Sequence, residues 1–149
     1  MAKSGELHFI RIFDFSLIPK PLIEQIPELP YTTEKLYEYA KAIGGDPFTL
    51  LYCLADKDHK IRGFWWGTMN PLDESLFIHL YSVEKGCQKE ENFVRRIVKF
   101  VDEITNRVDV TVRFATLHPK AFERVGAVRS KLTLMEYESK AQEEEKKEE

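Results

Sequence analysis

The sequence predicts an α+β fold in three layers, in which helices flank a central mixed, mostly antiparallel sheet. One observation is the order of segments with strand and helix patterns: strand, helix, three strands, long helix, strand, short helix and strand. The other is a pair of strand patterns at residues 60–69 and 76–83, separated by a polar turn that begins with Asn70 and Pro71. These two strands are expected to form a central antiparallel pair.

The first strand of this pair is rich in aromatic residues. Phe64, Trp65 and Trp66 favour a strand, and alternation places the two indoles on opposite faces of the sheet. Gly63 and Gly67 weaken a strand unless a bulge or a close approach of two backbones requires them, so we expect such a feature here. The second strand is apolar on both faces, which predicts that both of its faces are covered.

The first half of the chain holds four further elements. Four prolines between residues 16 and 30 allow only a short helix in an otherwise irregular crossing. Thr32 is a suitable N-cap for the helix that follows, and Gly44 and Gly45 are suited to end it. The expected elements are strands at residues 6–13 and 48–55, a short helix at 21–26 and a helix at 33–43.

The second half is organised around a long helix with an apolar stripe that is expected to pack on the sheet. The residues of the stripe are Phe93, Ile97, Phe100, Val101 and Ile104. Pro119 begins a short helix that Gly126 ends. The remaining expected elements are strands at residues 108–117 and 130–137.

Length and composition limit the class of protein. The chain has 149 residues, 43% of them hydrophobic, which suits a single domain over residues 1–138. Residues 139–149 are mostly Lys, Glu and Gln, and they are expected to form a disordered tail because they have no apolar face to bury. The formal net charge of -3 gives no reason to expect nucleic acid or an anionic membrane as a partner.

Other common signals are absent from the sequence. No run is apolar and long enough for a signal peptide or a membrane span, so we expect a soluble, cytoplasmic protein. Cys53 and Cys87 are too few for a disulfide scaffold, and the four histidines lack the spacing of a metal site, so we expect no metal. The partner, a protein or a small molecule, stays unknown, and an oligomer is possible.

Several segments carry a resemblance to a known family. They are the order of elements, Arg62-Gly63-Phe64 near the start of one central strand, Val83 at the end of the next, and residues 121–127 with the sequence Ala-Phe-Glu-Arg-Val-Gly-Ala. Over roughly residues 6–138, the chain resembles the GNAT superfamily of acyl-CoA-dependent N-acyltransferases.

The resemblance implies a cofactor site between two strands. The strand at residues 76–83 is expected to splay from the strand at 108–117, with an acyl-CoA in the gap and its pantetheine bonded to the strand backbone. In the family, a loop of pattern Gln/Arg-x-x-Gly-x-Gly/Ala wraps the pyrophosphate at the start of the long helix, where free amides and the helix dipole favour anions. If an acyl-CoA binds, the residues that the resemblance assigns to it are Tyr81, Val83, Gln88, Lys89 and Asn92.

The segment that matches this loop departs from the pattern. Gln88 is retained, but Glu91 and Phe93 replace the two glycines, and their side chains obstruct a close approach of backbone to phosphate. Glu90 and Glu91 also add negative charge where the pyrophosphate would lie. We therefore expect no cofactor, and acetyl-CoA or another acyl-CoA only if the protein is an enzyme. The cations that offer another way to neutralise phosphates are Lys85, Lys89, Arg95 and Arg96.

The expected catalytic residues are altered as well. Many family members carry a tyrosine that protonates the CoA thiolate four residues before the glycine that matches Gly126, and here that position is Phe122. His79 and Tyr81 are candidate replacements, and regular alternation places both on one face of the strand with Val83. His79 is suited to remove a proton from an amine because its ordinary pKa lies near neutrality, but a lone strand histidine can equally be structural.

Two functions fit these observations. The first is a GNAT-fold protein without standard acetyltransferase activity, whose old cofactor groove is occluded or has a binding or assembly role. The second is a divergent N-acetyltransferase that moves an acyl group from acyl-CoA to an amine. The altered loop and Phe122 favour the first function, and the resemblance in topology favours the second.

Overall fold

A computed structural model describes residues 7–27, 29, 31–42, 48–105, 110–131, 133–135 and 137. The chain divides into two compact units, Met1–His118 and Pro119–Glu149. The single domain expected over residues 1–138 stays a prediction. The two glycines expected to end a helix near residue 44 and the tail expected at residues 139–149 lie outside the described residues.

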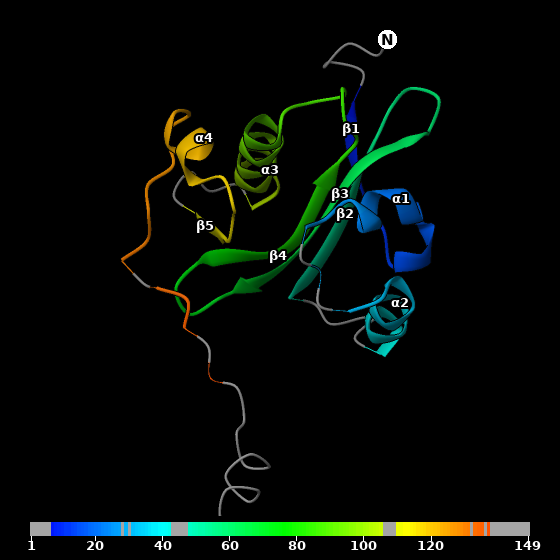
Figure 1. The fold of residues 1–149 in the computed structure, drawn as a ribbon, viewed down its shortest axis with the longest axis horizontal. Coiled ribbons are helices and arrows are strands. Elements are labelled where there is room, and N and C mark those ends of the chain that lie inside the picture. The colour runs from blue at the N-terminus through cyan, green and yellow to red at the C-terminus, as the bar shows by residue number, and fades with distance from the viewer. Residues whose placement is uncertain are drawn as a thin grey trace, which may run out of the picture. The chain divides into compact units, whose positions relative to one another are not determined.

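The first unit contains a five-stranded mixed sheet (Figure 1). Its strands are β1 (His8–Arg11), β2 (Thr49–Ala55), β3 (Ile61–Asn70), β4 (Ser75–Val83) and β5 (Thr111–Phe114). The strands lie side by side in chain order, and the first three neighbouring pairs are antiparallel, whereas β4 and β5 are parallel. This arrangement confirms the predicted mixed, mostly antiparallel sheet.

The described helices are mostly short. They are η2 (Phe15–Leu17, a 3-10 turn), α1 (Lys20–Glu24), α2 (Thr33–Ala42) and α3 (Glu90–Thr105) in the first unit and α4 (Pro119–Glu123) in the second. The Thr32 hydroxyl accepts a hydrogen bond from the Lys35 backbone N–H at 3.2 Å, which confirms the predicted N-cap of α2. The sequence patterns did not predict η2, which begins where the Asp14 carboxylate accepts a hydrogen bond from the Ser16 N–H at 2.9 Å.

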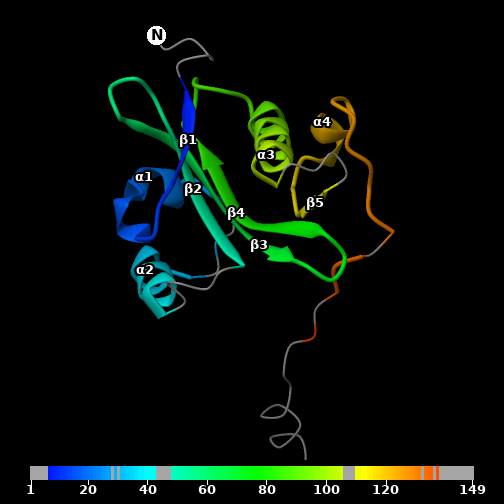
Figure 2. The ribbon, with the colours of Figure 1, turned by 180° about the vertical axis from the view of Figure 1, so that it is seen from behind.

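Helix α3 lies on one face of the sheet, whereas η2, α1 and α2 lie on the other (Figure 1 and, from behind, Figure 2). On the α3 side, the Phe93 ring lies 6.1 Å from the ring of Phe9 in β1. Phe93, Ile97 and Val101 are fully buried, which confirms that the stripe of the long helix packs on the sheet. Ile104 is 43% exposed, contrary to the prediction, and it lies in the last turn of α3, which ends at Thr105.

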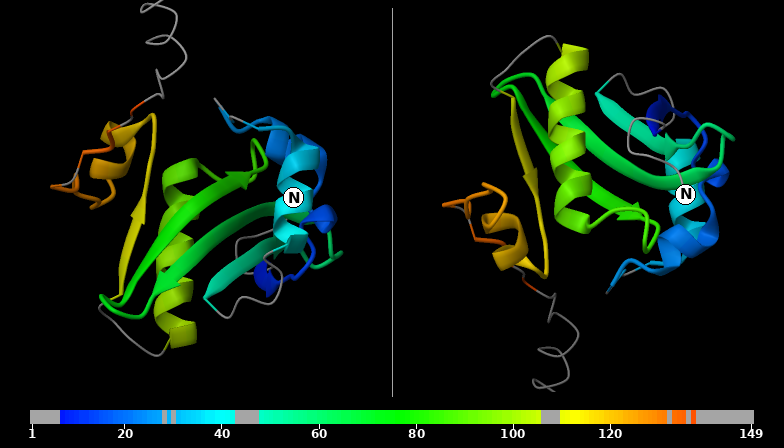
Figure 3. Two further views of the ribbon diagram at one scale, coloured as in Figure 1. Left: turned by 90° about the horizontal axis from the view of Figure 1, so that it is seen from below. Right: turned by 90° about the horizontal axis from the view of Figure 1, so that it is seen from above.

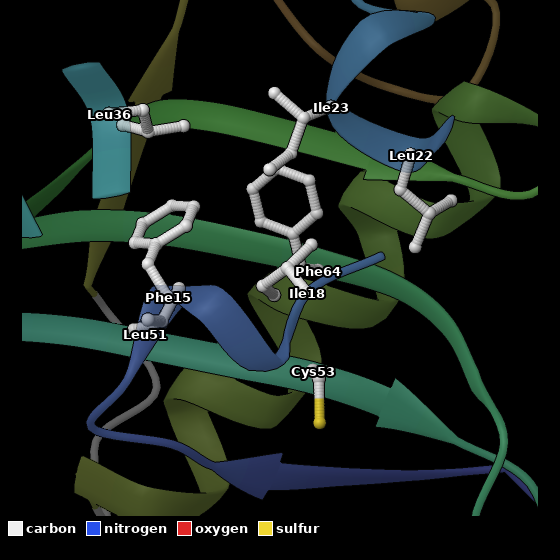
Figure 4. Packing of buried hydrophobic residues seen from close by; sticks show 8 residues of the cluster. All are labelled: Phe15, Ile18, Leu22, Ile23, Leu36, Leu51, Cys53 and Phe64. Carbon is white, nitrogen blue, oxygen red and sulfur yellow. The ribbon is translucent and has the colours of Figure 1, made fainter. Parts of the chain in front are cut away.

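The opposite face of the sheet carries a compact apolar core (Figure 4). Its buried members are Phe15, Ile18, Leu22, Ile23, Leu36, Leu51, Cys53 and Phe64. The Phe15 ring meets the Phe64 ring edge-on at 5.7 Å, and Trp66 and Leu80 pack at the border of the core, partly buried. Apolar contacts therefore hold η2, α1 and α2 against β2 and β3.

Gly63 and Gly67 lie where two backbones approach closely, as the sequence predicts. A Cβ atom on Gly63 would lie 2.9 Å from the carbonyl oxygen of Ser82, and a Cβ atom on Gly67 would lie 2.9 Å from the carbonyl oxygen of Phe77. Both distances are shorter than van der Waals contact, so even an alanine would displace β4 from β3.

Two strand predictions are wrong in part. One face of β4 is not fully covered, because Phe77 is 46% exposed and His79 is exposed, while the apolar core on that side lies against β2 and β3. The described residues of the range 130–137 form no strand, and Leu134 and Tyr137 among them are exposed. Alternating apolar residues favour a strand only where a neighbouring strand completes the hydrogen-bond ladder.

Helix α4 of the second unit ends as predicted. Gly126 has a φ of 103°, in the left-handed region that favours glycine. The N–H of Ala127 donates to the Phe122 carbonyl at 3.1 Å, and the N–H of Gly126 donates to the Glu123 carbonyl at 3.2 Å, which is the Schellman pattern of a helix end. Phe122 is buried and has no hydroxyl that could donate a proton.

Candidate functional site

The two strands of the candidate site run parallel and then diverge (Figure 3). The pairing of β4 with β5 ends where Ile78 lies opposite Phe114. β4 continues to Val83, and over this half it pairs only with β3 among the described strands. This is the splay of two strands that the resemblance implies.

A β-bulge interrupts β4 at His79. Trp66 and Gly67 are neighbours in β3, but they lie opposite Leu80 and Ile78, so His79 is an extra residue that has no partner in β3. Because side chains alternate between the two faces of a strand, one extra residue changes the phase of the alternation.

His79 and Tyr81 lie on opposite faces of the sheet as a result. The Tyr81 hydroxyl reaches α3, whereas the His79 ring contacts Trp66 on the face that η2, α1 and α2 cover. The prediction that the two side chains share a face with Val83 is therefore wrong for His79. That prediction assumed unbroken alternation along β4.

The His79 imidazole lies among aromatic and hydroxyl groups. Its Nε2 is 2.7 Å from the Thr68 hydroxyl, and its ring centroid is 4.8 Å from that of Trp66 and 5.3 Å from that of Phe77. Partial burial lowers the pKa of His79 below its ordinary value, because the charged form loses hydration. The imidazole is therefore neutral at pH 7 and able to accept a proton.

The Tyr81 hydroxyl donates a hydrogen bond to the carboxylate of Glu90, the first residue of α3. The Phe114 ring lies edge-on to the Tyr81 ring at 6.2 Å. Burial raises the pKa of Tyr81 far above its ordinary value, and the hydrogen bond and negative charge of Glu90 raise it further. Tyr81 therefore keeps its proton near neutral pH and directs it toward Glu90.

At the start of α3, side chains occupy the positions that the family pattern gives to glycine. Phe93 is fully buried, and its N–H donates to the Lys89 carbonyl at 2.9 Å, so this amide is used inside the helix. The Oε1 atom of Gln88 is buried and has no hydrogen-bond partner in the described part of the chain. Lys89 and Asn92 are exposed to solvent. The predicted cofactor residues of the loop are thus adjacent, but no glycine-lined cradle joins them.

Val83, another predicted cofactor residue, already has a partner. The amide nitrogen of Gln25, which follows α1, donates to the Val83 carbonyl at 2.7 Å and to the Ser82 hydroxyl at 2.6 Å. Sequence reasoning missed Gln25, because the contact joins residues 58 positions apart and no pattern in the sequence marks it.

The cationic side chains near the start of α3 differ in their exposure and in their hydrogen bonds. The Arg96 guanidinium donates to the Leu7 carbonyl at 3.5 Å, whereas Lys85, Lys89 and Arg95 are exposed. Their use as phosphate ligands stays a prediction.

The described residues include no group of three or more His, Cys, Asp or Glu side chains that could hold a metal ion. Cys53 and Cys87 are free cysteines. Within the same described ranges, no helix has the length and apolar character required to cross a membrane.

The sheet order and the splay of β4 from β5 define the GNAT acyltransferase fold. A mutant form of the spermidine N-acetyltransferase from Vibrio cholerae is similar, with a TM-score of 0.65 and 16% identity over 85% of this chain and 82% of that chain. The same V. cholerae acetyltransferase in complex with CoA and spermine gives a TM-score of 0.59 at 17% identity, over 83% of this chain and 81% of that chain. A possible acetyltransferase from Clostridium difficile 630 gives 0.64 at 15% identity, over 89% and 97%.

No family model and no curated protein matches this chain. At the identities of the similar structures, the shared property is the fold. The acyltransferase fold that the resemblance implied is therefore confirmed.

Proposed function

We propose that this GNAT-fold chain has a binding or assembly role and does not bind acetyl-CoA in the standard manner. The observation that carries the proposal is the Glu90 carboxylate in the first turn of α3, held there by the Tyr81 hydroxyl. A helix N-terminus stabilises one nearby anion through its free amides and its dipole. In this chain, Glu90 and Glu91 supply that negative charge from the protein itself.

A pyrophosphate in the same place would meet both carboxylates. Two like charges about 4 Å apart repel by about 1 kcal/mol in water and by more where they are partly buried. The buried Phe93 ring also stands where the family has a glycine, and the Val83 carbonyl already accepts a hydrogen bond from Gln25. The groups that an acyl-CoA would need at the loop and at the end of β4 therefore already interact with other residues of the chain.

A divergent N-acyltransferase is the second candidate. It is favoured by the neutral imidazole of His79 at the bulge where β4 leaves β5, and by the fold shared with a spermidine N-acetyltransferase solved with CoA and spermine. In that function, His79 would take a proton from the amine. Tyr81 would supply a proton to the departing thiolate, although its raised pKa and its hydrogen bond to Glu90 oppose that transfer.

A thermal titration with acetyl-CoA separates the two functions. A ligand that binds only the folded state stabilises it by RT ln(1 + [L]/Kd), so at about 1 mM acetyl-CoA a millimolar site adds about 0.4 kcal/mol and a micromolar site adds about 4 kcal/mol. We expect the smaller effect, and no release of free thiol above background when spermidine is added as an acceptor. A micromolar Kd together with thiol release would establish the acyltransferase instead.

A further inference from the structure

Four rings form a continuous row on the sheet face opposite α3. The centroid distances are 5.3 Å from Phe77 to His79, 4.8 Å from His79 to Trp66 and 5.9 Å from Trp66 to Tyr39 of α2. Phe77 is 46% exposed, Tyr39 is 54% exposed, His79 is exposed and Trp66 is half-buried at the border of the apolar core. We call these four residues the aromatic row. Phe77, His79 and Tyr39 are accessible to a ligand, and Trp66, whose indole N–H is buried, joins them.

The rings of the aromatic row are tilted against one another and are not stacked in parallel. Their interplanar angles are 53° between Phe77 and His79, 40° between His79 and Trp66, and 61° between Trp66 and Tyr39. Parallel stacking would remove the ring faces from solvent, whereas tilted rings leave part of each face open. The face of an aromatic ring carries partial negative charge and attracts cations.

No cation of the described chain occupies these ring faces. The cation–π contact found in the described residues lies elsewhere, where the Arg11 guanidinium sits 5.2 Å from the Phe13 ring centroid. Arg113 lies opposite Phe77 in the strand register, but its guanidinium is paired with Asp73 at 3.2 Å. The neutral state of His79 at pH 7 adds no repulsion toward an incoming cation.

We propose that the aromatic row binds a quaternary ammonium group. A primary ammonium gives up three strong hydrogen bonds to water when it moves onto aromatic rings, and that loss must be replaced by acceptors. A quaternary ammonium has no N–H bonds to lose, and its methyl groups pack on the rings while its charge faces them. Since a quaternary nitrogen cannot be acylated, this is a binding activity that goes beyond the proposed function and does not depend on the affinity for acetyl-CoA.

The test is a titration with choline followed by NMR. The probe signal is the indole N–H of Trp66, assigned with the variant Trp66→Phe. Dimethylbutanol, the neutral molecule in which carbon replaces the choline nitrogen, controls for apolar binding, and ethanolamine controls for a primary amine. We expect choline to bind about tenfold more tightly than either control, because the cation–π term acts on the charged quaternary group.

Two variants locate the site. Tyr39→Leu and Phe77→Leu keep apolar volume and remove a ring, so each is expected to weaken choline binding about fivefold. The matched control Phe13→Leu removes an exposed ring outside the aromatic row and is expected to leave choline binding unchanged. Unaltered signals of the remaining residues in the amide spectrum show that each variant is folded.

Four results would overturn the proposal. Equal binding of choline and dimethylbutanol would mean an apolar surface without charge selection. Tighter binding of ethanolamine would mean an amine site that relies on hydrogen bonds. No shift of the Trp66 signal, or equal choline affinity in wild type, Tyr39→Leu and Phe77→Leu, would place any binding elsewhere.

Discussion

The two faces of β4 differ in how their functional groups are used. On the α3 side, the Tyr81 hydroxyl is bonded to Glu90, and at the end of the strand the Val83 carbonyl is bonded to Gln25. On the other side, Phe77 and His79 are exposed and no cation of the described chain covers their rings. Groups that the chain has already paired offer little to a ligand, so we propose that the α3 side of β4 is closed to an acyl-CoA and that the opposite side is open.

The largest effect is expected from the packing that holds the closed side in place. Ile97→Ala removes a fully buried side chain of α3, and the usual cost of such a truncation is about 2–5 kcal/mol of unfolding free energy. Ile104→Ala, at an exposed position of the same helix, should cost less than about 0.5 kcal/mol. Denaturant unfolding measures both, and equal losses would reject this placement of α3.

A smaller loss is expected where β3 and β4 approach each other. The methyl group of Gly63→Ala would lie 2.9 Å from the Ser82 carbonyl, so the strands must separate, at a cost of about 1–3 kcal/mol. The same unfolding experiment measures it. If the variant is as stable as the wild type, β3 and β4 can separate without a loss of unfolding free energy. The sheet would then be less rigid than the distances indicate.

The sequence predicted the features that depend on local periodicity. The stripe through Phe93, Ile97 and Val101 repeats at helical spacing, and a helix buries such a stripe whatever its neighbours are. The loss of the glycines at Glu91 and Phe93 could also be read from the sequence, because the resemblance to a family fixed where the phosphate loop should begin.

Features that depend on strand register or on contacts between distant segments could not be predicted from the sequence. The bulge at His79 arises from the register between β3 and β4, and alternation alone placed that side chain on the wrong face. The bond from Gln25 to Val83 joins distant segments. The strand expected at residues 130–137 failed because apolar alternation does not supply a partner strand.

A still smaller effect is expected from the open face of β4 when the pH changes. The pKa of His79 is lowered in the folded state, so between about pH 6.5 and that lower pKa the unfolded chain binds more protons. The contribution of His79 to stability is therefore full above about pH 6.5 and falls as the pH drops through this range. His79→Gln should reduce this pH dependence. An NMR titration that finds the His79 pKa at or above about 6.5 would contradict the account.

The affinity of Glu90→Gln for acetyl-CoA tests the central claim most directly. The amide keeps an oxygen that can accept the Tyr81 hydrogen bond but removes the negative charge from the start of α3. We predict that acetyl-CoA binds about fivefold or more tightly to Glu90→Gln than to the wild type, because a repulsion of about 1 kcal/mol is lost. Glu103→Gln makes the same change of net charge near the other end of α3 and should leave the affinity unchanged. Equal affinity of Glu90→Gln and the wild type, or an equal gain in Glu103→Gln, would contradict the claim that Glu90 closes the cofactor side.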